Sequence, residues 1–124
     1  MATPEQIREV VEQYVALVGA GRGNSVVDLY TDDATVEDPV GTEVRRGRAA
    51  IAEFYGGLEG IDAEARLIDC RVAGHEAVFA FELATKAGDD TYVVSPFDHM
   101  VFDEDGRITA MRAFWAPERD MQVR

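Results

Sequence analysis

The sequence predicts an α+β fold in which three N-terminal helices pack on a curved, mostly antiparallel sheet that forms a conical pocket. Two observations predict it. Up to residue 58 most apolar side chains recur at helical spacing, with one short strand-like segment between the helices. From residue 62 onward long alternating segments are separated by glycine-containing turns. Helices followed by a strand meander are typical of α+β domains.

The first helix is expected to begin at Pro4. Thr3 and Gln6 form a capping-box pattern, and proline suits the first helical position. Spacings of three, four and seven residues then place Tyr14 on an inward apolar face, together with Ile7, Val10, Val11, Val15, Leu17 and Val18. The segment GAGRG at residues 19–23 ends this helix.

Two further helices and one strand precede residue 62. NSVVDLY, residues 24–30, predicts a short second helix capped by Asn24 or Ser25. ATVED, residues 34–38, predicts a strand. GRAAIAEFYGGL, residues 47–58, predicts a third helix that stops at the glycine pair Gly56 and Gly57.

Four strands complete the predicted fold. Their segments are DAEARLIDCRV (62–72), EAVFAFELATKA (76–87), DTYVVSPFDHMVFD (90–103) and GRITAMRAFWA (106–116). Short turns containing glycine separate them, which favours antiparallel pairing. The chain is expected to be a single domain, residues 1–124, because its length matches one ordinary domain.

Composition restricts the partners. A net charge of −12 would repel nucleic acid and anionic membrane surfaces, so neither is expected as a partner, and the ligand is expected to be neutral or apolar. No apolar run is long enough to span a bilayer, and no secretory signal is evident, so membrane insertion is not expected and a cytoplasmic location is.

Few residues suit metal or thiol chemistry. Cys70 is the one cysteine and is predicted to be a plain structural thiol. His75 and His99 are isolated, so no metal site is expected. The basic cluster Arg45, Arg46 and Arg48 is interpreted as a helix-entry surface or as salt-bridge partners for nearby acids.

Asp98 lies in an apolar row of the third predicted strand, among Val94, Pro96, Met100 and Phe102. If this row faces inward, Asp98 is paired or neutral, and a neutral acid can donate a hydrogen bond. The alternative is that the other row forms the core and Asp98 faces solvent. Both rows are largely apolar, and Pro96 can shift the phase, so spacing alone leaves both alternatives open.

Asp38 and three tyrosines are further candidates. Asp38 either organises the turn before Pro39 or points inward, opposite to Glu37. A buried phenol needs a partner for its hydroxyl, so inward tyrosines near a neutral carboxyl would form a hydrogen-bond network. The alternative is that they are ordinary core residues whose hydroxyls reach the surface. The three are Tyr14, Tyr30 and Tyr55, assigned to three different helices.

Four segments together resemble the bacterial Δ5-3-ketosteroid isomerases. They are TDDATVEDPVG (31–41), IAEFY (51–55), VVSPFDH (93–99) and MRAFW (111–115), and the similarity runs from about Thr3 to Trp115. The resemblance implies the nuclear-transport-factor-2-like (NTF2-like, also cystatin-like) fold. It also implies a homodimer formed through the outer face of the sheet.

The resemblance also implies roles for individual residues. Asp38 corresponds to the general base, and Tyr14 and Asp98 correspond to the donors of an oxyanion hole. Tyr30 and Tyr55 correspond to a supporting pair. The substrate-binding walls are expected to include Phe54, Phe81, Met111 and Trp115.

The implied function is isomerisation of a steroid substrate, in which a proton moves from C4 to C6 through a dienolate, and it implies no cofactor. Two alternatives remain open on the same fold. One is a non-catalytic steroid- or lipid-binding module in which Asp38 is only a loop acid. The other is a related cyclase or epoxide hydrolase, which would be expected to lack the joint presence of Tyr14, Asp38 and Asp98.

Overall fold

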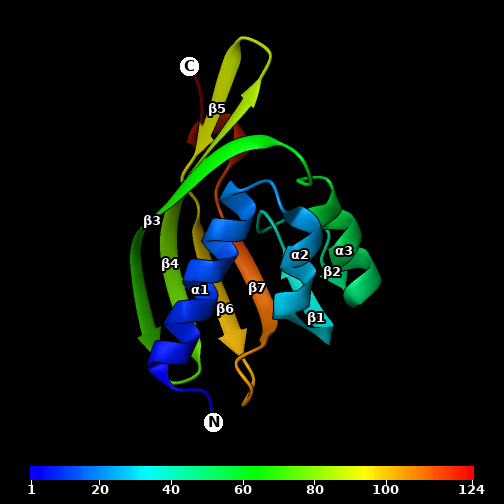
Figure 1. The fold of residues 1–124 in the computed structure, drawn as a ribbon, viewed down its shortest axis with the longest axis vertical. Coiled ribbons are helices and arrows are strands. Elements are labelled where there is room, and N and C mark those ends of the chain that lie inside the picture. The colour runs from blue at the N-terminus through cyan, green and yellow to red at the C-terminus, as the bar shows by residue number, and fades with distance from the viewer.

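A computed structural model describes all residues 1–124, and helices cover one face of a curved sheet in it (Figure 1). The helical elements are α1 (Pro4–Gly19), α2 (Gly23–Val26), the 3-10 turn η1 (Val27–Leu29), α3 (Arg48–Gly56) and α4 (Pro117–Asp120). The strands are β1 (Tyr30–Glu37), β2 (Arg45–Arg46), β3 (Asp62–Ala73), β4 (Glu76–Ala87), β5 (Asp90–Val94), β6 (Phe97–Phe102), β7 (Ile108–Phe114) and β8 (Met121–Val123).

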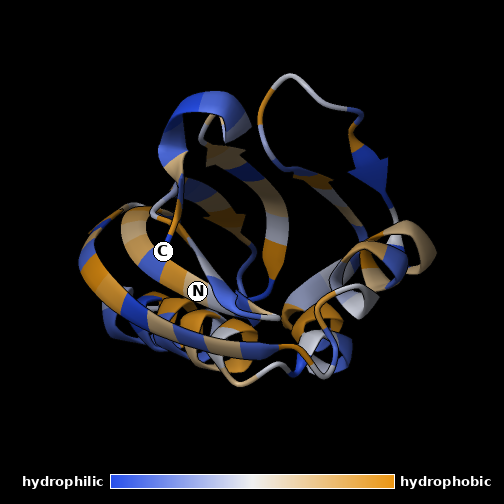
Figure 2. Cartoon of the chain, turned by 90° about the horizontal axis from the view of Figure 1, so that it is seen from above, coloured by the Kyte–Doolittle hydropathy of each residue, from blue (hydrophilic) through white to orange (hydrophobic).

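All eight strands belong to one sheet with the order β2-β1-β7-β6-β4-β5-β8, and β3 pairs with the other edge of β4. Every pairing is antiparallel except that of β1 with β7, which is parallel. The predicted α+β class, with helices on a curved and mostly antiparallel sheet, is therefore confirmed. Figure 2 shows the long strands bending around, with hydrophobic and hydrophilic residues alternating along them.

The predicted third strand is two strands in the structure. β5 pairs with the second half of β4, whereas β6 pairs with its first half, and Ser95 and Pro96 connect them. Proline cannot donate a backbone hydrogen bond, which explains why regular pairing is interrupted there. Because β5 then continues beyond the helices, the β4–β5 hairpin projects at the end of the molecule where the C-terminus lies (Figure 1).

Helix α1 forms as predicted. The Gln6 backbone N–H donates to the Thr3 hydroxyl, and the Gln6 side chain accepts from the Thr3 N–H, which completes the capping box. Tyr14 is 3% exposed and faces the sheet. Its buried neighbours on α1 are Ile7, Val11, Val15 and Val18.

The second helix is shorter than predicted. The sequence assigned residues 24–30 to it, but α2 and η1 end at Leu29, and Tyr30 is the first residue of β1. The assignment of Tyr30 to a helix was therefore wrong, because an apolar pair at helical spacing does not reveal where a strand begins. Gly23 opens α2 so close to α3 that a Cβ atom there would meet the Tyr55 carbonyl oxygen. This contact fixes α2 against the end of α3.

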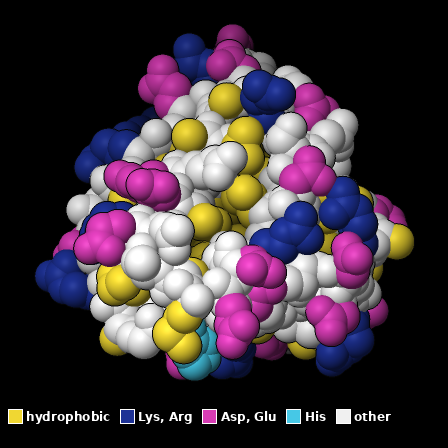
Figure 3. Space-filling view, turned by 60° about the horizontal axis from the view of Figure 1, so that its bottom comes forward, with side chains coloured by type: hydrophobic (Ala, Val, Ile, Leu, Met, Phe, Trp, Pro, Cys, Tyr) yellow, Lys and Arg dark blue, Asp and Glu magenta, His cyan; other side chains and the backbone are white.

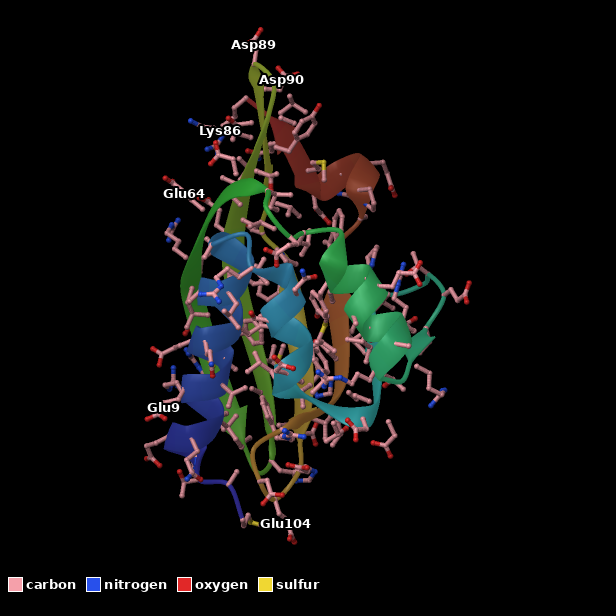
Figure 4. All side chains as sticks on the ribbon, turned by 45° about the vertical axis from the view of Figure 1, so that its right-hand side comes forward. Glu9, Glu64, Lys86, Asp89, Asp90 and Glu104 are labelled. Carbon is pink, nitrogen blue, oxygen red and sulfur yellow. The ribbon has the colours of Figure 1, made fainter.

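The charge surplus lies on the outside. Figure 4 shows Glu9, Glu64, Asp89, Asp90 and Glu104 pointing away from the body of the molecule. Inside, one core joins the helices to the sheet, and its largest fully buried side chains include Tyr30, Tyr55, Phe79, Met100 and Met111. None of the helices combines the length and the apolar character needed to cross a membrane.

Candidate active site

A cavity of about 400 Å³ opens between the helices and the sheet. This volume is within the range of roughly 300–1,000 Å³ that small-molecule sites occupy. Eleven of its fifteen lining residues are hydrophobic. The lining residues are Tyr14, Val18, Asp38, Phe54, Tyr55, Leu58, Phe81, Leu83, Thr85, Tyr92, Val94, Pro96, Asp98, Trp115 and Met121.

Apolar side chains also gather on the molecular surface. Figure 3 shows one face on which they occupy a central hollow, with acidic and basic side chains of both signs around it. Asp38 and Asp98 are the two residues with carboxyl groups in the lining of the cavity, and most of the other lining residues are hydrophobic. An ionisable group in such surroundings is a candidate for function because its protonation is set by its position.

Asp98 faces inward, so the first of the two alternatives for its strand is correct. It is 1% exposed and pairs in register with Phe79 on β4 and Ala113 on β7. Its Oδ1 atom is buried and has no hydrogen-bond partner within the chain. Burial raises the pKa of the Asp98 carboxyl well above its usual value, and the charge of Asp38 raises it further. Both effects favour the protonated form of Asp98, in which the carboxyl group can donate a hydrogen bond.

The three tyrosines form a buried hydrogen-bonded chain. The hydroxyl oxygens of Tyr14 and Tyr55 are 3.2 Å apart, and those of Tyr55 and Tyr30 are 2.6 Å apart. None of the three is more than 3% exposed, so the alternative of hydroxyls that reach the surface is wrong. Burial raises the pKa of each phenol well above its usual value, so all three are neutral.

The ring of Tyr14 is held from several sides. Its centroid lies 6.1 Å from that of Phe79 and 6.2 Å from that of Phe81, in both cases edge to face. A third edge-to-face contact joins it to Tyr55 at 6.0 Å. Aromatic pairs favour this arrangement, which restricts the direction of the phenol. Tyr14, which lines the cavity, is thus held by three aromatic neighbours.

Asp38 lies in the cavity wall and Glu37 on the opposite side, as predicted. The parallel strands β1 and β7 end at the same edge, which brings Asp38 beside Trp115 although 77 residues separate them. The Trp115 indole N–H donates to Asp38 Oδ1 at 2.8 Å. Glu37 instead accepts from Arg112 and from the Gly41 N–H outside the cavity.

The surroundings of Asp38 include contacts that raise the pKa of its carboxyl group and contacts that lower it. Burial raises the pKa of the Asp38 carboxyl above its usual value, while the hydrogen bond from Trp115 and the charge of Arg45 counteract part of that rise. Asp98 has no such counteracting contact. The cavity therefore contains two carboxyl groups with different tendencies to ionise, which is the arrangement needed for an acid and a base in one site.

Most of the predicted site residues meet at this cavity. Tyr14, Asp38, Asp98, Tyr55, Phe54, Phe81 and Trp115 all line it, and Tyr30 supports it through Tyr55. Met111 does not line it. It is 1% exposed and pairs with Met100 and Val36 in the core, because it lies four residues before Trp115 and so deeper along β7.

Several lining residues were not singled out from the sequence. Leu83 and Thr85 follow Phe81 with a period of two on β4, so strand alternation alone indicates that they share its face. Met121 had no such signal. It reaches the cavity because β8 adds to the edge of β5, with Met121 opposite Val94.

Other polar residues lie outside the cavity. His99 faces away from Asp98 and hydrogen-bonds Glu76 at 2.6 Å, and His75 is exposed. Cys70 is buried in the core, where burial raises the pKa of its thiol. Arg48 pairs with Asp28, as expected for the basic cluster. No group of three or more histidine, cysteine, aspartate or glutamate side chains is arranged to hold a metal ion.

Comparisons with known proteins point to one family. Residues 11–111 match the family model of the SnoaL-like domain. A curated steroid Δ-isomerase from Nocardioides simplex is 51% identical over 113 residues, which cover 90% of this chain and 91% of that protein.

A solved structure provides a second comparison. The epoxide hydrolase/cyclase-like enzyme SalBIII, described as acting in pyran ring formation in the polyether salinomycin, superimposes with a TM-score of 0.88. The alignment covers 100% of both chains at 25% identity. Together with the SnoaL-like match, this likeness confirms the NTF2-like fold predicted from the sequence.

Proposed function

The chain belongs to the SnoaL-like domain family, and we propose that it is a steroid Δ-isomerase that converts Δ5-3-ketosteroids into Δ4-3-ketosteroids. The observation that carries this proposal is the coexistence of Asp38, Tyr14 and Asp98 on the wall of one apolar cavity. The reaction moves a proton from C4 to C6 of the steroid through a dienolate. It needs one base and a pair of donors to the 3-oxygen.

Asp38 is proposed as the base. Its contact with Trp115 supports the ionised form, because a hydrogen bond donated to a carboxylate stabilises its charge. It removes the C4 proton, carries it, and returns it to C6 of the same molecule. The steroid rings occupy the apolar wall, which holds the two carbons in reach of one carboxylate.

Tyr14 and Asp98 are proposed as the oxyanion hole. Each is a neutral donor, and Asp98 Oδ1 makes no hydrogen bond within the chain. Tyr55 and Tyr30 extend the chain of hydroxyls behind Tyr14, so charge that develops on the steroid oxygen is shared along the network. Ketosteroid isomerases are an established case of a protonated aspartate paired with a tyrosine, so this assignment is carried over from them.

The magnitudes are consistent with this division of roles. If the C4 proton is roughly eight pKa units less acidic than a carboxylic acid, the mismatch is about 11 kcal/mol. Two preorganised donors at about 2.7–4 kcal/mol each supply roughly half or more of it. Holding the carboxylate against the carbon supplies the remainder. No step requires a cofactor.

A spectrophotometric assay tests the proposal. The conjugated enone product absorbs in the near ultraviolet and the unconjugated substrate does not. Mixing the protein with 5-androstene-3,17-dione should therefore give a rapid rise in absorbance. Binding of this steroid without any rise would instead identify a non-catalytic binding module, and neither binding nor turnover would direct attention to a cyclase or hydrolase.

We further propose a homodimer formed through the face of the sheet that the helices leave open. Phe97 on β6 lies opposite Phe114 on β7, and both are exposed together with Val78 on β4. Large apolar side chains clustered on an exposed face are typical of protein interfaces. Sedimentation should give twice the mass of one chain, and Phe97→Glu should reduce it to a monomer.

A further inference from the structure

Two buried polar atoms have no hydrogen-bond partner within the chain, Asp98 Oδ1 and Arg45 Nη1. Asp98 lines the cavity, where a ligand oxygen can meet it. Arg45 does not line the cavity, and it makes no salt bridge although Glu43 and Glu53 lie on the adjoining surface. Buried polar groups are rarely left unpaired, so Arg45 calls for a specific explanation.

The sheet register places Arg45 on the side of the base. Arg45 on β2 lies directly opposite Val36 on β1, and residues opposite each other project to the same face. Asp38 follows Val36 by two residues and shares that face as well. Arg46 lies opposite Thr35, projects to the other face and is exposed.

The Arg45 side chain is held by the cavity wall. Its guanidinium carbon lies 4.3 Å from the centroid of the Phe54 ring, within the range of a cation–π contact. Phe54 lines the cavity with Asp38, and its ring packs edge to face on Tyr55 at 4.9 Å. Arg45 is therefore connected to the site through one aromatic ring.

We propose that Arg45 is a positioning residue for Asp38, a role that rests on the proposed function of Asp38 as the base. Its guanidinium holds the Phe54 ring in the wall and supplies the positive charge that keeps the Asp38 carboxylate ionised in an apolar cavity. Positive charge near a carboxylate lowers its pKa, which is the direction in which Arg45 acts on Asp38.

The other groups around Asp38 do not supply positive charge. The segment after β7 contributes the neutral indole of Trp115, and β6 contributes the neutral acid Asp98. The remaining groups are phenols with raised pKa values, namely Tyr14 from α1, Tyr30 from β1 and Tyr55 from α3. Removing the Arg45 charge should therefore leave Asp38 with the Trp115 hydrogen bond alone.

A titration of Asp38 in the absence of substrate tests this role. The carbon-13 resonance of its carboxyl group, assigned by its loss in Asp38→Asn, reports ionisation directly. In Arg45→Met and Arg45→Gln the midpoint should rise by roughly 0.5–1 pH unit, less than the ~1–3 units of a cation in direct contact, because Arg45 is partly exposed. Arg45→Lys should retain most of the parent midpoint, and Arg46→Met should leave it unchanged.

Two results would overturn the proposal. One is an unchanged midpoint in both uncharged variants of Arg45, and the other is an equal rise in Arg46→Met, which would indicate an effect of net charge. Because the titration uses no steroid, it gives its answer even if the protein has no isomerase activity. If it has, the acid limb of kcat/KM should shift with the same midpoint.

Discussion

Asp38 and Asp98 are the same amino acid in two different surroundings. Asp98 is 1% exposed, lies within β6, which pairs with β4 and β7 on its two sides, and has no partner for Oδ1. Asp38 follows the end of β1, is partly exposed, and accepts a hydrogen bond from Trp115. Burial opposes ionisation of both, but only Asp38 has contacts that favour its charged form.

The difference shows how one cavity separates a donor from a base. Its place in β6, between β4 and β7, gives Asp98 paired neighbours on both sides, Phe79 and Ala113. A position at a strand end gives Asp38 access to residues of other elements, Trp115 after β7 and Arg45 on β2. The protonation state is therefore a consequence of where each residue stands in its strand.

Among the variants considered, Asp38→Asn should have the largest effect on turnover. It removes the one lining carboxylate that the surroundings help to ionise, and the neutral Asp98 cannot replace it. We expect turnover of a Δ5-3-ketosteroid to fall by about 10⁴, the upper end of the usual range for a general base.

A planar phenolic steroid should still bind to Asp38→Asn, because the apolar wall and the donors are unchanged. Stopped-flow absorbance measures the turnover, and fluorescence of the ligand measures the binding. Retention of parent turnover would show that Asp38 is not the base.

Tyr14→Phe tests the donor side. The variant keeps the ring contacts with Phe79 and Phe81 and loses the hydroxyl next to Tyr55. One donor fewer should lower kcat by roughly 10²–10³, with a similar loss in Asp98→Ala. Thermal unfolding should confirm that Tyr14→Phe remains folded. Normal kcat in both variants would place the oxyanion hole elsewhere.

Strand alternation in the sequence predicted the direction of Asp38, but it did not decide the direction of Asp98. The row Val94, Pro96 and Asp98 already had the right period, and only the choice of face was open. Spacing cannot make that choice when both rows are apolar, and the pairing with β4 and β7 decides it. The opposite directions of Glu37 and Asp38 did follow from strand alternation.

Contacts between distant segments were beyond the reach of sequence patterns. The hydrogen bond between Trp115 and Asp38 depends on the parallel pairing of β1 with β7. The position of Arg45 depends on β2, a two-residue strand too short to leave a pattern. Met111 was wrongly assigned to the cavity, because period and apolar character do not show how deep along β7 a residue lies.

Asp98→Asn separates hydrogen-bond donation by residue 98 from its titration, because asparagine keeps a donor and does not titrate. Turnover should fall by about tenfold, as for a donor weaker by about 1.4 kcal/mol. Stability should change in the opposite direction. Folding raises the pKa of Asp98, so burying it becomes unfavourable as pH rises above about 3.9, the value in the unfolded chain.

The stability gain of Asp98→Asn should therefore be smallest below about pH 4 and should grow with pH until Asp98 ionises in the folded parent protein. Urea unfolding at several pH values measures it. An equal gain at every pH would mean that Asp98 does not hold its proton more tightly in the folded state.

Trp115→Phe should have the smallest effect. It removes the donor to Asp38 Oδ1 and keeps an aromatic ring in the cavity wall. Since that hydrogen bond lowers the pKa of Asp38, its loss should raise the pKa and move the acid limb of kcat/KM to higher pH. At pH values well above the limb Asp38 is ionised in both proteins, so the rise in its pKa no longer lowers turnover there, and turnover should differ by only a few-fold. A parallel loss at every pH would instead mean that Trp115 orients the carboxylate without affecting its charge, and the contrast between Asp38 and Asp98 would then depend on burial and on Arg45.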